Sequence, residues 1–179
     1  MWIARTFSMP NHETFTVPPI KELLDLEIED DGKNWLDPFA RNSQRAEKRN
    51  DINPATKAEY HLDAVDFLKM FPDGSADGCL YDPPYSPRQV KECYDGIGIK
   101  YTYEESTNQK VKEAKNEIAR VVKPGGKVIS FGWNSNGMGA KRGFVKVRIL
   151  LVSHGGLHND TICVVEQKVV ENTFEGLLA

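Results

Sequence analysis

The sequence is poor in cysteine and has no long hydrophobic run. Its three cysteines, Cys79, Cys93 and Cys163, are far apart and form no CxxC pair, so neither a disulfide framework nor a zinc-finger spacing is indicated. No apolar stretch approaches the roughly 20 residues that a membrane span needs. The first 15 residues also lack the apolar core of a secretory signal. We therefore expect a cytoplasmic protein without membrane contact.

The chain also has no overall excess of positive charge. Its 23 Lys and Arg residues face 26 Asp and Glu residues, for a formal net charge of −3 and a pI near 5.8. This balance does not indicate a general nucleic-acid binder, but the charges are unevenly distributed. Residues 21–31 are acidic, whereas residues 41–49 and 141–148 are basic. The basic segments are either local phosphate-binding stripes or ordinary solvated faces.

We find no internal repeat, no low-complexity segment and no convincing metal site. His154 and His158 are four residues apart, but they flank a Gly-Gly pair rather than lying on one helix. No Cys or carboxylate completes a zinc ligand set around them, and we expect a hairpin turn there. The length of 179 residues fits one well-cored domain. We expect that domain over residues 15–179, after a loose lead-in over 1–14 that shows no clear periodicity.

Hydrophobic spacing predicts alternating strands and helices along the rest of the chain. Helices are expected at 18–28, at 54–59, within 61–71 and at 108–122, the last with Val111, Ala114 and Ile118 on its apolar face. Strands are expected at 34–37, before Asp51, within 75–85 and at 126–133, and a β-hairpin over 144–169. This order predicts an α/β fold with a mostly parallel sheet and a C-terminal antiparallel hairpin.

Four acidic residues follow or close the predicted strands. They are Asp37, Asp51, Asp63 and Asp82. Ligands of parallel sheets bind at the carboxyl ends of the strands. The four acids together therefore predict one lined crevice at that edge.

The segment "CLYDPPYSPRQ" at residues 79–89 ends a buried strand with an acid, two prolines and an aromatic residue. Pro83 and Pro84 remove two backbone donors, so neither a helix nor a central strand continues through them. The segment is predicted to be a rigid, exposed strand end that presents Asp82 and Tyr85.

"DPPY" resembles the catalytic motif of the DNA amino-group methyltransferases that use S-adenosylmethionine. Further segments are similar to that family in the expected order: "FTVPP" (15–19), "DPFA" (37–40), "DIN" (51–53), "DA" (63–64) and "VVKPGGKVISFGW" (121–133). The resemblance covers about residues 15–168. It implies a class I S-adenosylmethionine-dependent methyltransferase fold, which is Rossmann-like, with cofactor motifs preceding the catalytic motif.

The resemblance also implies roles for individual residues, and no metal. The catalytic residues would be Asp82, Pro83, Pro84 and Tyr85. The cofactor-binding residues would be Thr16, Pro18, Asp37, Pro38, Phe39, Ala40, Arg41, Asn42, Asp51, Ile52, Asn53, Asp63, Ala64 and Asp82. Among these, Asp51 would bind the ribose hydroxyls and Asp63 the adenine.

The chemistry of methyl transfer to an amine accounts for these residue types. The lone pair of an exocyclic amine is delocalised into its ring, so the nitrogen is a poor nucleophile. If the Asp82 carboxylate and the Pro83 carbonyl each accept an N–H, the lone pair can localise toward the methyl group. Tyr85 would offer a flat face on which an extruded base stacks.

One segment departs from the family's glycine-rich loop. Residues 37–44 read "DPFARNSQ", with Arg41, Asn42 and Ser43 where glycines would let the backbone approach the cofactor. We expect a working variant in which Asn42 adopts the left-handed conformation or Arg41 binds the cofactor's carboxylate. A non-catalytic protein that kept the fold and binds DNA or a partner remains an alternative.

The loops over 86–108 and 133–143 are the only candidates for target recognition. The residues expected to contact nucleic acid are Arg88, Gln89, Lys91, Trp133, Asn134, Lys141 and Arg142. Without a recognition domain, we expect an orphan, phage-like adenine-N6 DNA methyltransferase of a bacterial or phage-infected cell. Its target would be very short or relaxed, with single-stranded or mismatched DNA as a substrate, or its specificity would come from an oligomeric partner such as a homodimer. RNA adenine methylation is the alternative reaction, whereas cytosine-N4 enzymes usually carry Ser at position 82.

Overall fold

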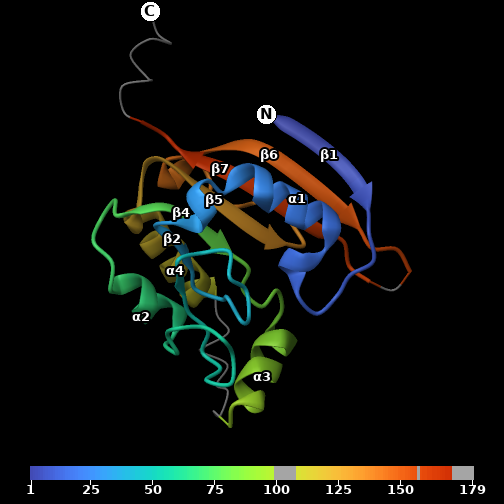
Figure 1. The fold of residues 1–179 in the computed structure, drawn as a ribbon, viewed down its shortest axis with the longest axis horizontal. Helices are drawn as coiled ribbons and strands as arrows, with labels where there is room; N and C mark the ends of the chain where they lie inside the picture. Colours follow the sequence, from blue (N-terminus) through green and yellow to red (C-terminus); the bar gives the residue numbers. More distant parts are fainter. Residues whose placement is uncertain (99–107, 157, 171–179) are drawn as a thin grey trace, which may run out of the picture.

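The computed structural model describes residues 1–98, 108–156 and 158–170, and seven strands in this part of the chain form one sheet (Figure 1). The sheet order is β1-β6-β7-β5-β4-β2-β3. The strands are β1 (Trp2–Phe7), β2 (Trp35–Asp37), β3 (Lys48–Arg49), β4 (Ala76–Tyr81), β5 (Val122–Gly132), β6 (Phe144–Ser153) and β7 (Thr161–Lys168). Every neighbouring pair is parallel except the two pairs that contain β7. The predicted mostly parallel sheet with a C-terminal antiparallel hairpin is thus confirmed.

Helices cover both faces of the sheet. On one face α1 (Pro18–Glu27) buries Ile20, Leu23 and Leu24, which recur at helical spacing. They pack with inward side chains of five strands, among them Leu80 of β4 and Val152 of β6. Figure 1 shows α1 lying across the strands on the viewer's side.

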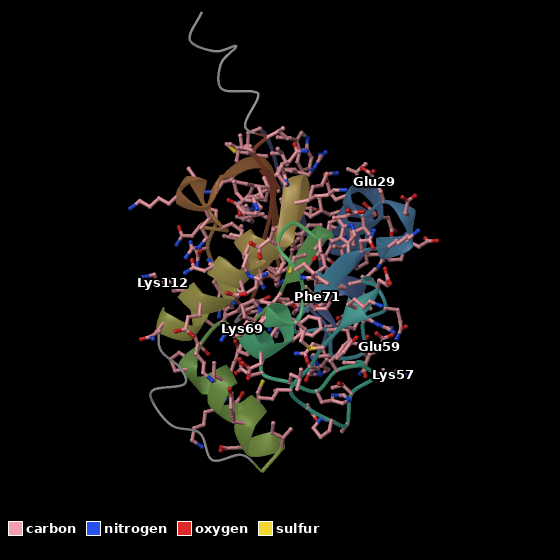
Figure 2. The ribbon with its side chains drawn as sticks, turned by 90° about the vertical axis from the view of Figure 1, so that its left-hand side faces the viewer. Glu29, Lys57, Glu59, Lys69, Phe71 and Lys112 are labelled. Carbon is pink, nitrogen blue, oxygen red and sulfur yellow. The ribbon has the colours of Figure 1, made fainter. Side chains whose placement is uncertain are left out.

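The second face is covered by α2 (Ala64–Lys69) and α4 (Asn108–Val121). Phe67 and Leu68 of α2 and Ile118 of α4 pack there with Cys79 and Val128 of the sheet. Figure 2 shows the two helices from the side, with Lys69 and Phe71 at the end of α2 and Lys112 on α4. Val111 was predicted on the apolar face of α4, but its side chain is 43% exposed. The buried stripe is therefore narrower than its spacing suggested.

The N-terminal segment differs from the prediction. Residues 2–7, expected within a loose lead-in, form β1, which pairs in parallel with β6 from Trp2 opposite Arg148 to Phe7 opposite Ser153. Residues 14–16 form a single 3-10 turn, η1. Because both faces of this edge strand carry partly or fully exposed side chains, its sequence shows no alternation of apolar and polar residues.

The helix predicted at 54–59 does not form, and the segment runs as turns. The Asn53 side chain accepts the Ala55 amide at 2.9 Å, and the Thr56 hydroxyl donates to the Asn53 carbonyl at 2.9 Å. Such local bonds offer the backbone an alternative to the helix. Lys57 and Glu59 mark this loop in Figure 2.

Two features determine how β4 pairs with its neighbours β2 and β5. Gly78 faces Trp35 of β2 so closely that a Cβ atom there would lie 2.5 Å from the Trp35 ring. The Pro-Gly-Gly segment at 124–126 lies in β5 as an irregularity, because the register with β4 jumps from Val122 to Lys127. The segment therefore interrupts the pairing of β5 with β4 without ending the strand.

The first half of the predicted catalytic loop is helical. Ser86 caps α3 (Pro87–Gly96) by accepting the Gln89 amide, and Pro87 occupies its first turn. This helix has no fully buried side chain, and in Figure 1 it stands apart from the layers at the lower edge of the molecule. Residues 99–107 of the predicted loop lie outside the described residues.

No helix in the described part of the chain combines the length and the apolarity that a membrane crossing requires.

Candidate functional site

The structure brings three of the four predicted acids close together at the carboxyl ends of neighbouring strands. Asp37 ends β2, Asp51 follows β3, and Asp82 follows β4. The charges of Asp82 and Asp51 both act on the Asp37 carboxyl group. Three of the four acids therefore lie at one edge of the sheet, as the strand ends predicted, although only Asp82 lines a cavity there.

Asp37 is the most deeply buried of them. Its side chain is inaccessible to solvent, Oδ1 accepts the Phe39 amide at 3.0 Å, and Oδ2 has no hydrogen-bond partner. Burial raises the pKa of Asp37 well above its usual range, and the neighbouring charges raise it further. The ionised form is thus disfavoured, which makes this group a hydrogen-bonding rather than a charged element of the site.

Asp51 organises the loop that departs from the glycine-rich pattern. Its Oδ2 accepts the Arg41 amide at 3.1 Å and its Oδ1 accepts the Asn53 amide at 2.9 Å. Arg41, not Asn42, adopts the left-handed conformation, with φ of 49°. Its guanidinium donates to the His12 carbonyl at 2.6 Å, so in this structure it is already engaged by the protein.

Asp63 lies at the start of α2 and acts first as a helix cap. Its Oδ1 accepts the Val65 amide at 2.9 Å, and its Oδ2 forms an ion pair with Lys110 of α4 at 3.1 Å. A cap interaction of this kind accounts for an acid at this position without any ligand. The role in adenine binding remains a prediction.

Asn50, which the sequence analysis did not single out, connects the strand ends. This fully buried residue donates to the carbonyls of Pro38 and Leu62 at 3.1 and 3.0 Å and accepts the Leu62 amide at 2.9 Å. It thereby ties the segment after β2 to the segment that precedes α2. A buried amide directly before a strand-end acid is the signal that could have found it.

The "DPPY" segment places an acid and two aromatic rings together. The Tyr85 hydroxyl donates to Asp82 Oδ1, and the Tyr85 amide donates to Gln89 Oε1 at 2.6 Å. The Tyr85 ring meets Trp133 edge to face, with centroids 5.6 Å apart. Trp133, at the end of β5, is 43% exposed, so a partly open aromatic pair flanks Asp82.

Burial raises the pKa values of Asp82 and Tyr85. Desolvation raises the pKa of Asp82, and hydrogen bonds from Tyr85 and Thr14 oppose the rise. Desolvation, together with the Asp82 charge, raises the pKa of Tyr85, so the phenol stays protonated and remains a donor. The pair therefore presents a carboxylate with stronger proton affinity than an exposed aspartate.

A cavity of about 530 Å³ adjoins this carboxylate, which forms part of its wall. Six residues with predicted roles line it: Thr16, Phe39, Ala40, Arg41, Asn42 and Asp82. The predicted residues Pro18, Asp37, Pro38, Asp51, Ile52, Asn53, Asp63 and Ala64 do not line it, although Asp51 holds the backbone of its wall residue Arg41.

The sequence analysis assigned no binding role to the remaining wall residues. Glu13, Thr14, Phe15, Lys21, Ser43, Gln44 and Arg45 also line the cavity. Glu13 lies in the segment expected to be only a lead-in, yet its carboxylate accepts from the Asn42 amide group at 3.4 Å. No local pattern marks these residues, because tertiary pairing brings residues 12–16 against the 40–45 loop.

Three of the basic residues predicted to contact nucleic acid are engaged within the protein. Arg88 and Lys91 form ion pairs with Glu92 and Asp95 on the same exposed helix, so α3 presents balanced charges. Arg142 donates to Asn116 of α4 at 2.9 Å and to the Met138 carbonyl at 3.1 Å, which makes it an anchor of the 133–143 loop.

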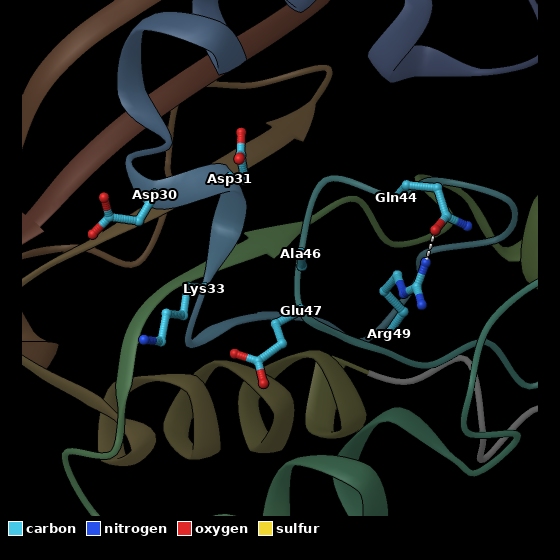
Figure 3. Close-up of a pocket in the computed structure, with 7 residues that line it drawn as sticks. All are labelled: Asp30, Asp31, Lys33, Gln44, Ala46, Glu47 and Arg49. Atoms are coloured by element: carbon cyan, nitrogen blue, oxygen red, sulfur yellow. Dashed lines mark hydrogen bonds between the residues drawn. The ribbon is translucent and has the colours of Figure 1, made fainter.

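Two other features lie outside the cavity beside Asp82, although the first shares the wall residue Gln44 with it. A hollow of about 310 Å³ lies beside the start of β2 and β3, lined by Asp30, Asp31, Lys33, Gln44, Ala46, Glu47 and Arg49 (Figure 3). Its charges have both signs, and Arg49 is engaged by Gln44 and Glu59. His154 is buried, and its two ring nitrogens bond the Ser8 carbonyl and the Thr161 hydroxyl at 2.6 and 2.8 Å, which is a structural role.

Comparison with known proteins identifies the fold. No family model and no curated protein sequence matches the chain. Among solved structures, the N-methyltransferase NodS from Bradyrhizobium japonicum WM9 matches with a TM-score of 0.54 and 11% identity, over 84% of this chain and 94% of NodS. TrmN from Thermus thermophilus matches with a TM-score of 0.51 and 16% identity, over 86% of this chain and 49% of TrmN.

A third structure, TTHA0409, also from Thermus thermophilus, is provisionally described as a DNA modification methylase. It matches with a TM-score of 0.43 and 16% identity, over 61% of this chain and 52% of its own. The chain thus spans about half the length of TrmN and TTHA0409. At these identities the likeness to NodS and TrmN shows the fold alone, which is the class I methyltransferase fold.

Proposed function

We propose that this chain transfers a methyl group from S-adenosylmethionine to the exocyclic N6 of adenine in DNA, within a short or relaxed target. One observation carries the proposal. Asp82 lies at the carboxyl end of β4, forms part of the wall of the 530 Å³ cavity and contacts the Tyr85–Trp133 aromatic pair. A carboxylate acceptor, a ring for stacking and room for a cofactor thus occur at the edge where parallel sheets bind ligands.

The cavity is compatible with the cofactor in size and in lining. Small-molecule sites usually measure about 300–1,000 Å³, a range that includes this cavity. The cavity adjoins residues 39–43, which follow β2. Thr16 and Arg41, which line the cavity, would contact the methionine end. Asp51 lies behind this wall, where it accepts the Arg41 and Asn53 amides, and its remaining acceptor sites would bind the ribose hydroxyls. The bound cofactor would supply an electrophilic methyl group on a sulfonium centre.

The chain's own groups would prepare the amine. The Asp82 carboxylate and the Pro83 carbonyl accept the two N–H groups, which localises the nitrogen lone pair for attack on the methyl carbon. The cofactor would supply the methyl group for the new N–C bond and leave as its thioether, and the surplus proton on the nitrogen would pass to Asp82 or to water. In the present structure Tyr85 occupies one Asp82 oxygen, so the incoming amine would share or replace that hydrogen bond.

The aromatic pair would hold the base. Stacking on one aromatic ring contributes about 1–3 kcal/mol per base and tolerates any base. Tyr85 offers the inner ring and Trp133 the outer, more exposed one. The acceptor geometry, not the stacking, would therefore select an amine.

The direct test is incubation of the protein with radiolabelled S-adenosylmethionine and unmodified DNA, followed by nucleoside analysis. We expect N6-methyladenine from wild type and none from Asp82→Ala, which should still bind the cofactor. Asp95→Ala, an exposed acid on α3, is the matched control and should retain activity. Label in RNA but not in DNA would replace DNA with RNA as the substrate, and label in neither would contradict methylation of nucleic acid.

A non-catalytic binding protein is the second candidate, favoured by the loop at 41–43. Arg41 occupies a left-handed position usually taken by glycine and bridges to the His12 carbonyl. Calorimetric titration with S-adenosylmethionine separates the two candidates, because a protein that lost its cofactor site should give no heat of binding. For a working enzyme, Asp51→Ala should weaken binding by about 1–3 kcal/mol, the usual loss for one partner of a charge-assisted hydrogen bond.

A further inference from the structure

Exposed apolar side chains concentrate on the first strand. Five of the twelve large hydrophobic residues that are exposed in the described part of the chain lie within its first nine positions: Met1, Trp2, Ile3, Phe7 and Met9, at 47–76% exposure. Clusters of this kind on a folded protein usually mark an interaction surface.

β1 is also an edge strand of the sheet. In the described part of the chain β1 pairs with β6 alone. The Ser8 amide donates to the Ser153 carbonyl at 3.0 Å, toward β6. Since backbone groups of successive residues point to opposite sides of a strand, the amides and carbonyls of Ile3, Arg5 and Phe7 point to the open edge.

The usual protection of an open edge is weak here. Natural edges carry lysines, prolines, bulges or a covering segment that prevent pairing with another chain. β1 is a regular strand of six residues in unbroken register with β6, and Arg5 is its one charged residue. An edge of this kind is a template for a further strand.

We propose that β1 pairs antiparallel with β1 of a second copy of this chain, so that two sheets join across a two-fold axis. A two-fold axis perpendicular to the sheet keeps each residue on its own face and makes the contact isologous. Odd-numbered residues then lie opposite odd-numbered residues of the partner, and even-numbered residues opposite even-numbered ones. Ala4 can lie opposite the partner's Ala4, and Ile3 opposite the partner's Arg5.

Charge selects this register over its neighbour. A shift by one residue in each copy would place Arg5 opposite the partner's Arg5, and like charges directly opposite each other are destabilising. With Ala4 on the axis, Arg5 instead meets an aliphatic side chain. Ile3 and Arg5, whose backbone groups point outward, then form the hydrogen-bonded pairs.

The apolar area supports a second copy as the occupant. Four of the five side chains, Met1, Trp2, Ile3 and Phe7, lie in the paired segment of this register, and each is 47–76% exposed. Phe7 would lie opposite the partner's Met1, so the pairing would cover exposed apolar surface of both copies. The antiparallel arrangement points the carboxyl edges of the two sheets in opposite directions. Each candidate site would therefore act independently, and the pairing would not alter activity per chain.

Sedimentation of the full chain over a concentration series tests the pairing. We expect a reversible monomer–dimer equilibrium, and a monomer at every concentration up to about 1 mM would overturn the proposal. Ile3→Lys places a like charge opposite the partner's Arg5 and should raise the dimer dissociation constant by about tenfold or more. Ile3→Glu, matched in position and polarity, places an opposite charge there and should dimerise more tightly than Ile3→Lys. Equal weakening by both substitutions would overturn the register.

Crosslinking tests the axis directly. In a Cys93→Ser background, which removes the exposed thiol, Ala4→Cys should form a disulfide-linked dimer under mild oxidation. Ala4 and the partner's Ala4 form a non-hydrogen-bonded pair, in which the Cβ atoms approach to about 4.5 Å, the upper end of the range that a disulfide spans. Thr6→Cys lies on the same face but would face the partner's Trp2, and it should not crosslink. Equal crosslinking of the two variants would overturn this arrangement.

Discussion

At the scale of single residues, Tyr85 acts on Asp82 in two ways. Its hydroxyl donates to the Asp82 carboxylate and lowers the pKa of that group, against the larger effect of burial. Its ring contacts Trp133 and is the proposed stacking surface for the base beside Asp82. The two contributions can be separated by substitution.

We predict that Tyr85→Phe retains methyl transfer, whereas Tyr85→Ala loses it by about tenfold to a hundredfold, because stacking requires a ring. Asp82 must be ionised to accept the amine, so activity falls as the pH drops through its pKa. Tyr85→Phe removes a hydrogen bond that lowers this pKa and should move the acid limb of kcat to higher pH. A kcat profile of each variant from pH 5 to 9 measures both effects. An unmoved limb would mean that Asp82 is not the titrating group.

Asp37 gives a prediction about stability. Burial raises its folded-state pKa, so its contribution to stability is fully present below the unfolded pKa and is lost as the pH rises through the folded pKa. Asp37→Asn keeps an acceptor for the Phe39 amide and removes the ionisation. The variant should therefore unfold at a higher temperature than wild type at pH 7–8, and the difference should shrink toward pH 4. Thermal unfolding across this range is the measurement, and a lower melting temperature at pH 8 would contradict the assignment.

At the scale of elements, the loop over 133–143 is held by a buried carboxylate of β7. Glu166 is inaccessible to solvent, and its two oxygens accept the amides of Met138 and Gly139. A Cβ atom at Gly137 would lie 2.2 Å from Glu166 Oε2, so glycine is required there. Lys115 of α4 completes the anchor by donating to the Gly137 carbonyl at 2.6 Å.

We predict that Glu166→Gln destabilises the protein by about 1–3 kcal/mol, because one oxygen becomes an NH₂ group that faces a backbone donor. Glu29→Gln makes the same chemical change at a side chain that is 82% exposed and should change stability by less than about 0.5 kcal/mol. Urea unfolding of both variants measures the free energies. Equal effects would mean that the two amides do not depend on the Glu166 charge.

At the scale of the whole molecule, the described residues offer few free side chains for reading a base sequence. Arg88 and Lys91 are paired within α3, and Arg142 is bound to α4. Each good bidentate base contact provides only about 1–3 kcal/mol of discrimination. Long recognition sites should therefore be out of reach.

We predict methylation of adenine within about four base pairs of context or fewer, at rates on single-stranded or mismatched DNA at least comparable to those on duplex. Extrusion of the base costs less from such substrates. Mapping of methylated adenines on a randomised substrate tests the context, and paired oligonucleotides test the strandedness. A strict site of six or more defined bases for the purified monomer would refute the argument.

Much of the architecture was determined by the sequence itself. The spacing of the apolar residues predicted α1 and α4, each of which buries one face, and the continuous apolar runs predicted β4 and the β6–β7 hairpin, of which the central strands β4 and β7 are buried on both faces. Pro83 and Pro84 likewise determine locally that the strand ends at Asp82. The order of acids along the chain indicated a shared edge, since parallel strands bring their carboxyl ends together.

Other features were decided only by tertiary contacts. β1 exists because residues 2–7 pair with residues 148–153, far along the chain, and an edge strand exposed on both faces leaves no periodic signal. The left-handed Arg41 is held by Asp51 and by the His12 carbonyl, although Asn42 has the more favourable local propensity. Burial of Asp37, and the wall that Glu13 and Thr14 add to the cavity, likewise arise where distant segments pack. Local residue patterns report the faces that a segment buries by itself, whereas pairing between distant segments depends on the assembled core.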